Sequence, residues 1–217
     1  MRDIVAYWGK YHEKFLTALG EHVAIVLLTL VISLVLAAVL TLLIRNHPRF
    51  SNGVVQFFGA VYSIPSLALF ALLIPISGLG LKTAIPVLVV YNQFLLLRNI
   101  LEGLDGVDRS MLEAARGMGM TDQQVLTRVQ LPLAMPMVIA GLRLAAISTI
   151  GIGTIAATIN AGGLGAILME GLRTMNLAKL LGGTLLCTLI ALVTNSLLKA
   201  LENHLWKKQG RDRQEPA

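Results

Sequence analysis

The chain has 217 residues, of which 55% are hydrophobic and 14% charged, with a formal net charge of +6 and a mean hydropathy of +0.73. Soluble domains carry roughly 25% charged residues, so this composition excludes an ordinary water-soluble domain and predicts an integral membrane protein. The positive charge does not indicate a nucleic-acid partner, because the basic residues lie between apolar stretches rather than in a patch interleaved with aromatics.

The first part of the chain, residues 1–20, is predicted to form an amphipathic segment. Its apolar positions recur at spacings of three and four, which places them on one helical face. These positions are Ile4, Trp8, Tyr11, Phe15 and Leu19. Two interpretations remain open for this segment: a helix lying in the membrane interface, or a short helix packed on other parts of the protein.

Five apolar stretches follow, and each is long enough to cross a membrane, which takes about 20 residues. They cover residues 23–44, 54–76, 84–101, 137–159 and 177–201. We therefore predict an all-α membrane protein with about five transmembrane helices in a domain over 21–202, followed by a polar tail over 203–217. The second stretch contains Pro65 and Pro75, so its freed backbone groups need neighbouring helices.

A polar island at 110–132 separates the third and fourth stretches, and two helix starts are predicted in it. Ser110 with Glu113, and Thr121 with Gln124, match the capping box, in which each side chain satisfies a free backbone N–H of the other. The island therefore predicts two short helices outside the membrane.

Glycines between the two helix starts predict how these helices are joined. At Gly117 and Gly119 the chain can leave the first helix through positive φ and enter the next at an angle. Pro132 is expected to stop the second helix.

The island also resembles the EAA loop of permeases in binding-protein-dependent ABC importers. The matching positions are Glu113-Ala114-Ala115, Gly119, Val129 and Leu131-Pro132 at the spacing of that motif, where the family prefers Ile at the position of Val129. The resemblance implies a type I ABC importer-like fold in which this cytoplasmic loop is the coupling helix that docks on a separate ATPase.

The residues that the resemblance implies for ATPase coupling are Glu113, Ala114, Ala115, Gly117, Gly119, Leu131 and Pro132. The small side chains of Ala114 and Ala115 permit close approach to a partner, and Glu113 offers a carboxylate to a basic group on it. The alternative is a solvated loop with ordinary helix caps, but caps alone require neither the two alanines nor the Leu-Pro pair.

Three further segments resemble the branch of that family that imports osmoprotectants such as glycine betaine, choline, carnitine or proline. They are SIPSL at 63–67, GMGMT at 117–121 and AGGLG at 161–165. Permeases of amino-acid importers of the methionine type share the EAA loop and the Gly-Gly-Leu-Gly segment, so this cargo is the alternative.

Polar and small residues within the apolar stretches are candidates for a pathway or gate. These candidates are Ser63, Pro65, Ser66, Asn92, Gln93, Thr154, Thr158, Asn160, Gly162, Gly163 and Gly165. Asn92 and Gln93 either line a pathway or form hydrogen bonds between helices, and both interpretations stay open. For the glycine-rich segment we expect an outer gate combined with close packing. Arg143 is expected to reach the cytoplasmic surface and serve as an anchor.

No catalytic or metal site is predicted. The chain lacks a G-x-x-x-x-G-K-[ST] nucleotide loop, and its four histidines are scattered near the ends of the stretches. We expect no cofactor on this chain and expect ATP and Mg to bind a partner ATPase. A secondary transporter driven by an ion gradient is less favoured, because it calls for a carboxylate within the membrane and no Asp or Glu lies inside a predicted stretch.

Orientation follows from the basic residues. More Lys and Arg lie on the side of the 110–132 loop than on the other, which predicts that this side is cytoplasmic, with the N-terminus outside and the C-terminus inside. The expected location is a bacterial inner membrane. The expected partners are lipid, cytoplasmic ATPase subunits, an extracytoplasmic substrate-binding protein and a second permease copy or paralogue.

Overall fold

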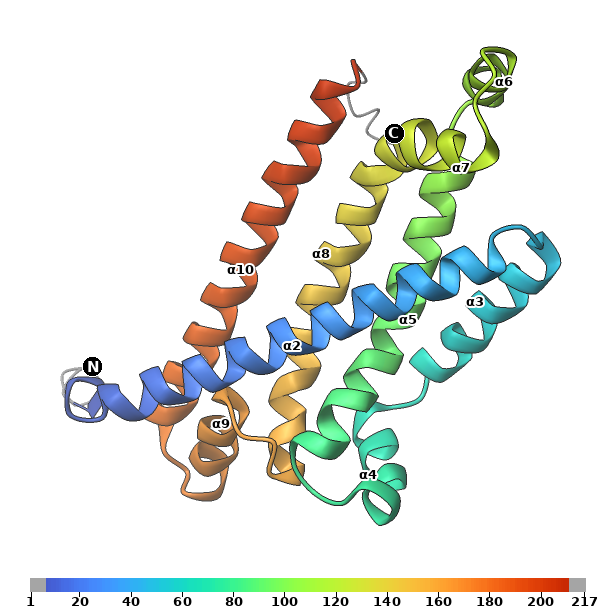
Figure 1. The fold of residues 1–217 in the computed structure, drawn as a ribbon. Helices are drawn as coiled ribbons and strands as arrows, with labels where there is room; N and C mark the ends of the chain where they lie inside the picture. Colours follow the sequence, from blue (N-terminus) through green and yellow to red (C-terminus); the bar gives the residue numbers. More distant parts are fainter. Residues whose placement is uncertain (1–6, 211–217) are drawn as a thin grey trace.

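A computed structural model describes residues 7–210, and this part of the chain consists of helices joined by short connections, without a strand. Four helices are long and apolar enough to cross a membrane by themselves. They are α2 (His12–Ile44), α5 (Leu81–Asp105), α8 (Leu131–Ile155) and α10 (Leu177–Lys208). Figure 1 shows α8 between α5 and α10, with α2 crossing them obliquely, and α2 packs against both α5 and α8.

The second predicted span is not straight. It consists of α3 (Pro48–Tyr62) and α4 (Ser66–Ser77), which meet at an angle of 95°. Pro65 lies at this break, where it removes a backbone N–H and disfavours a helical conformation of the preceding residue. Counted with this bent pair as one span, up to five helices cross the membrane, so the expectation of about five is confirmed.

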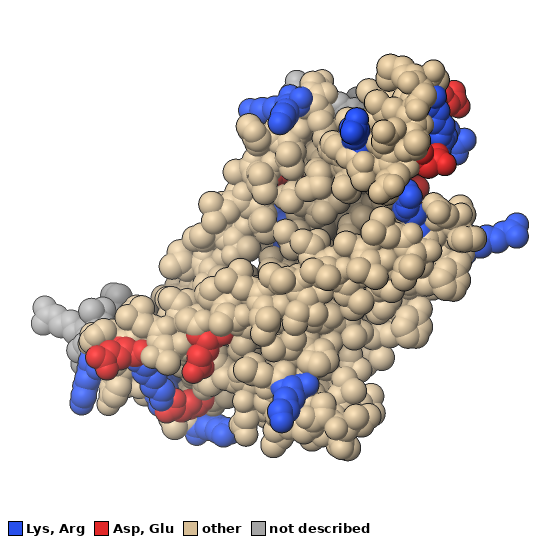
Figure 2. All heavy atoms as spheres, viewed as in Figure 1, with Lys and Arg blue, Asp and Glu red and all other residues tan. Residues whose placement is uncertain are grey.

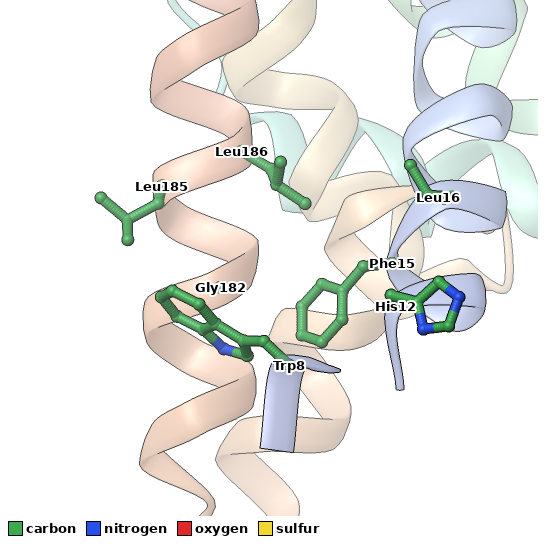
Figure 3. Close-up of a pocket in the computed structure, with 7 residues that line it drawn as sticks. All are labelled: Trp8, His12, Phe15, Leu16, Gly182, Leu185 and Leu186. Atoms are coloured by element: carbon green, nitrogen blue, oxygen red, sulfur yellow. The ribbon is translucent and has the colours of Figure 1, made fainter. Parts of the chain in front are cut away.

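The described part of the N-terminal segment, which includes the first turns of α2, packs against α10. Trp8 donates a hydrogen bond from Nε1 to the carbonyl oxygen of Ala178 over 2.8 Å, and Phe15 is buried. Figure 3 shows both side chains beside Gly182, and these residues line an apolar pocket of about 280 Å³. A Cβ at Gly182 would lie 2.6 Å from the Phe15 ring, so glycine permits this contact. The second interpretation of this segment therefore fits its described part; Ile4 lies outside the described residues.

Helix boundaries differ modestly from the predicted stretches at the other end of the chain. The predicted polar tail begins at 203, but α10 continues as a helix to Lys208. The rest of the predicted tail from residue 211 lies outside the described residues. The segment after the glycine run forms α9 (Leu164–Arg173).

Charged side chains gather at the two ends of the molecule, with an uncharged belt between them in the view of Figure 2. At one end lie the start of α2, α4 and α9; at the other lie the end of α10 and two short helices, α6 (Arg109–Gly117) and α7 (Asp122–Gln124). The start of α2 and the end of α10 are thus at opposite ends, as the predicted orientation requires.

The tightest packing lies where α2, α5 and α8 meet. Ala37 from α2 and Ala145 from α8 are both fully buried beside Leu96 and Leu97 of α5. Small residues let helix backbones approach closely, which matters in a bilayer because lipid tails are as apolar as the packed side chains. This core holds the loop at one end and the glycine-rich segment at the other in fixed relation.

Candidate coupling and pathway sites

The predicted helix–elbow–helix is present at the end of α5, but its first cap is a different residue. Asp108 is the N-cap of α6, and its Oδ1 accepts a hydrogen bond from the Ser110 backbone N–H over 2.9 Å. The predicted Ser110–Glu113 box is therefore wrong, because α6 starts earlier and an acidic side chain already occupies the cap. The second box is confirmed: Thr121 and Gln124 bond each other reciprocally over 2.9 and 3.3 Å.

Gly119, and not Gly117, turns the chain at the elbow. Gly117 is the last residue of α6, whereas Gly119 has a φ of +82°. The backbone N–H groups of Gly119 and Met120 donate back to the carbonyl oxygens of Arg116 and Ala115. These bonds satisfy free carbonyls at the end of the helix, as a left-handed glycine commonly allows.

The three residues of the Glu-Ala-Ala motif divide between two faces of α6. Glu113 and Ala114 are exposed, and Ala115 is only 2% exposed because it faces the rest of the protein. Ala115 therefore lets α6 lie close to the following helix, while Glu113 and Ala114 remain available to a partner.

The prediction that Pro132 stops the second helix is wrong. From Asp122 to Ile159 the chain forms one continuous helical span: α7, the π-helical turn η1 (Val125–Gln130), α8 and the 3₁₀ turn η2 (Ala156–Ile159). Pro132 occupies the first turn of α8, where its missing N–H is tolerated in a widened π turn. The adjacent Leu131 N–H donates to the carbonyl of Leu126, five residues back.

A polar cavity of about 390 Å³ lies behind the elbow. Arg45 and Asn46 line it from the α2–α3 connection, Asp105 from α5, and Arg116 and Asp122 from the elbow. Arg116 and Asp122 form an exposed ion pair across the elbow, with Nη2 and Oδ1 3.3 Å apart. The elbow therefore meets α5 both across this polar cavity and through apolar packing, since Leu126 lies in the same buried cluster as Leu101 and Leu104.

The bend between α3 and α4 holds the first group of pathway candidates. Ser63 and Pro65 are exposed and Ser66 is half-buried. The Ser63 hydroxyl donates to the carbonyl of Ala60 over 2.7 Å, within its own turn. Tyr91 of α5 fixes the bend by donating its hydroxyl to the carbonyl of Ile64 over 2.7 Å.

Asn92 and Gln93 are buried among helices of this chain. Asn92 is 1% exposed, and its side chain bonds Ser33 of α2 and Thr149 of α8 at 3.2 and 2.9 Å. Gln93 is fully buried and donates to the carbonyl of Ser33 over 3.2 Å. In this conformation the geometry favours hydrogen bonding between helices over a pathway lining for these two residues. The Asn92 amide alone connects α5 to both α2 and α8.

The remaining candidates surround the outer end of α8. Thr154 and Thr158 satisfy their hydroxyls on carbonyls of their own helical turns, and Thr158 and Asn160 are exposed. Asn160 adopts the left-handed conformation with a φ of 64°, which Asn tolerates better than most residues.

The glycine-rich segment then packs back against α8. Gly162 and Gly163 have φ values of +83° and +70°. A Cβ at Gly165 would lie 2.1 Å from the carbonyl oxygen of Thr154, so no side chain fits there. The predicted site residues therefore lie in four places: the coupling residues at and after the elbow, Ser63, Pro65 and Ser66 at the α3–α4 bend, the 154–165 group at the end of α8, and Asn92 and Gln93 inside the bundle.

The sequence interpretation missed two polar contacts. His22 lies just before the first apolar stretch in the sequence, but it is fully buried and its Nε2 lies 3.2 Å from the carbonyl oxygen of Ile150. Arg143 was predicted to reach the surface, and this is wrong: it pairs with Glu202 of α10, which is 3% exposed. A buried carboxylate on a spanning helix was also unexpected. Helical spacing alone could not identify these pairs, since their members are far apart in the chain.

Comparison with known proteins assigns this architecture to a family. The family model described as binding-protein-dependent transport system inner membrane component matches residues 29–210. The carnitine transport permease protein OpuCB of Listeria monocytogenes is 34% identical, with 99% of each chain covered. The glycine betaine/carnitine/choline transport system permease protein OpuCB of Bacillus subtilis (strain 168) is 33% identical, with 96% of each covered.

A solved structure has the same fold. In an inward-facing structure of the MetNI methionine ABC transporter, one chain superposes with a TM-score of 0.79 at 20% identity, covering 88% of this chain and 95% of the other. The type I importer-like fold is therefore confirmed, and the apolar helices make this a multi-pass membrane protein. The chain belongs to the family of inner membrane components of binding-protein-dependent transport systems.

Proposed function

We propose that this chain is the permease subunit of an ATP-driven importer for osmoprotectants of the quaternary ammonium class, such as glycine betaine, choline or carnitine. The two relatives named for these solutes cover nearly the whole chain at 33–34% identity, which supports this cargo over methionine. The likeness to the methionine transporter supports only the shared fold, because its identity is 20%.

The single observation that carries the mechanism is the exposed face of α6. Glu113 and Ala114 stand free on a short helix outside the bundle, while Ala115 holds that helix to the span that continues into α8. A partner that grips α6 therefore moves α8 directly, since η1 and α8 form one helical span with the elbow's second helix.

In the proposed cycle, a cytoplasmic ATPase pair binds ATP and Mg and closes, and α6 transmits this closure to the bundle. This is a two-state element biased by a partner. The complex includes a second permease copy or paralogue around a shared pathway, and a substrate-binding protein outside a bacterial cytoplasmic membrane. This chain itself binds no nucleotide or metal in the proposal.

Reconstitution tests the proposal. The permease, a cognate ATPase and a cognate substrate-binding protein are placed in lipid vesicles, and ATPase activity is measured with glycine betaine, choline, carnitine or methionine. We expect stimulation by the quaternary ammonium solutes and its loss in Glu113→Arg, which reverses the charge on the exposed face without filling any internal space. Stimulation by methionine alone would overturn the cargo.

An ion-gradient mechanism is the other class to test. The buried Glu202 does not provide a free carboxylate for it, because Arg143 lies against it with Nε and Oε2 3.2 Å apart. Uptake that continues in vesicles lacking the ATPase would contradict the importer proposal.

A further inference from the structure

Two consecutive residues of α2 hold the glycine-rich segment at the outer end of the bundle. The Gly163 backbone N–H donates to Oε2 of Glu21 over 2.9 Å. The next side chain, His22, is fully buried between this segment and α8, with Nε2 close to the carbonyl of Ile150. One turn of α2 thus contacts α8 and the segment that follows it.

The fit between these residues depends on the absence of side chains at the glycines. A Cβ at Gly162 would lie 2.9 Å from Oε2 of Glu21, and a Cβ at Gly163 would lie 2.9 Å from Nδ1 of His22. Gly153 of α8 also lies against the His22 ring, where a Cβ would be 3.3 Å from Cε1. Three glycines therefore form the surface that receives the Glu21–His22 pair.

This contact bears on the whole outer end of the bundle. The held segment follows η2 directly, and the carbonyl of Ile159 in η2 accepts a hydrogen bond from Gly80, which begins α5, over 2.6 Å. The α4–α5 connection is therefore hydrogen-bonded to the α8–α9 connection, and α2 contacts the α8–α9 connection through Glu21 and His22.

The His22 ring retains an unused polar atom. Nδ1 is buried against Gly163 and has no hydrogen-bond partner among the residues that the structure describes. An unpaired buried polar atom is unfavourable, so movement of the glycine segment away from α2 would let water reach Nδ1 and offset part of the lost Glu21 bond. Two arrangements of the segment can therefore lie close in free energy.

We propose that Glu21 and His22 are positioning residues that latch the glycine segment 161–165 onto α2, and that import requires this latch to open and close. The inference rests on the proposed function, because it takes this segment as the outer gate. Glu21 is exposed to solvent, which weakens this bond, so we expect its removal to shift the closed-to-open ratio about three- to tenfold.

The test uses the reconstituted complete importer. Glu21→Ala removes the acceptor, Glu21→Gln keeps an acceptor oxygen, and Glu13→Ala is the matched control on an exposed part of α2. In Glu21→Ala we expect higher basal ATPase activity and at least about a threefold lower ratio of solute-stimulated to basal activity. Glu21→Gln restores part of this ratio, and Glu13→Ala behaves as wild type.

A purely structural role gives a different result. If Glu21→Ala only reduces the amount of folded complex, while the stimulation ratio per folded complex equals that of wild type, the latch is wrong. His22→Leu, which removes both nitrogens and is close to histidine in volume, is a second variant: we expect a lowered ratio, and a wild-type ratio would likewise contradict the inference.

Amide hydrogen exchange in the permease alone separates this inference from the proposed function. Gly163 is expected to exchange about three- to tenfold faster in Glu21→Ala than in wild type or Glu13→Ala. Equal exchange would overturn the latch even if solutes stimulate the transporter. Absence of solute stimulation in wild type, with the exchange difference present, would overturn the proposed function and leave the contact established.

Discussion

Arg143 and Glu202 form a buried ion pair between α8 and α10, with Nε and Oε2 3.2 Å apart and side chains only 17% and 4% exposed. Asn195 of α10 adds a contact of 3.3 Å from its Oδ1 to Nη1 of the same arginine. Removing one member of such a pair leaves a charge without compensation in a low-dielectric setting. The pair thus fixes how the peripheral helix α10 lies on α8.

We predict that Glu202→Ala lowers the free energy of unfolding by about 3 kcal/mol, whereas the double variant Arg143→Leu/Glu202→Leu loses less than Glu202→Ala alone. Thermal unfolding in detergent measures both. The control is Glu102→Ala, which breaks an exposed pair with Arg98 and should cost at most about 0.5 kcal/mol. A double variant less stable than the single one would contradict this account.

The two glycines of the elbow are predicted to respond differently to alanine. Gly119 has a φ of +82° and open space around it, so Gly119→Ala strains the backbone by about 1–2 kcal/mol without a clash. Gly117 is helical and also has open space, so Gly117→Ala is neutral or stabilising.

Solute-stimulated ATPase activity in vesicles tests this pair. We expect a reduced stimulation ratio for Gly119→Ala and a wild-type ratio for Gly117→Ala. A loss in Gly117→Ala as large as that in Gly119→Ala would mean that a partner surface, and not the backbone angle, decides the effect.

The sequence could predict the elbow because its signals are local. Reciprocal caps at Thr121 and Gln124, and a glycine where φ is positive, act within a few residues of each other. The prediction for Pro132 was wrong because the effect of a proline depends on its place in the helix. A proline just after the last turn ends a helix, but a proline in the first turn is tolerated, and here Pro132 lies in the first turn of α8, directly after the π turn η1.

Contacts between distant segments could not be predicted in this way. Asn92 reads as a costly polar residue in a span, and only the assembled bundle shows that Ser33 and Thr149 satisfy it. The bend at Pro65 is similar: the proline indicated an interruption, but neither its 95° angle nor the hydrogen bond that Tyr91 of α5 makes to it could be predicted from local sequence.

Asn92 carries a prediction of its own. Asn92→Leu should destabilise the protein by about 0.6–2 kcal/mol, since it leaves two hydroxyls buried without their amide partner. A double-mutant cycle with Thr149→Val measures the coupling, and the two losses should be less than additive. Strict additivity would show that the 2.9 Å contact carries no stability.

Gly165 and Gly151 give a contrast at the outer end. A Cβ at Gly165 meets the Thr154 carbonyl at 2.1 Å, so Gly165→Ala must displace α9 and should destabilise by several kcal/mol. Gly151 is exposed with nothing within 4 Å, so Gly151→Ala should leave the stability of the single chain unchanged.

Unfolding in detergent and import in vesicles are measured together for both. Loss of import in a Gly151→Ala protein of normal stability would place Gly151 against another chain of the complex. A Gly165→Ala protein as stable as wild type would contradict the close contact with α8.

Glu170 of α9 joins two other helices through its carboxylate. Lys14 of α2 and Lys179 of α10 donate to its two oxygens over 2.5 and 2.9 Å. The hydrogen bond from Lys14, followed by that from Lys179, lowers the pKa of Glu170 below its ordinary value of 4.5. A carboxyl whose pKa is lowered by folding stabilises the protein above its unfolded pKa, and this stability is lost as the pH falls through the folded value.

We therefore expect Glu170→Gln to unfold at a lower temperature than wild type at pH 7, with the difference shrinking as the pH falls below 4.5 and disappearing once the folded wild-type carboxyl has taken up its proton. The difference is small, because the Glu170 side chain is 39% exposed and solvent screens the pair. Thermal unfolding between about pH 3 and pH 8 measures it. Lys14 lies on α2 and Lys179 on α10, so the Glu170 carboxylate links three helices. If the difference instead grew as the pH fell, the charges would oppose the association of these helices, and packing around Phe15 would hold them together.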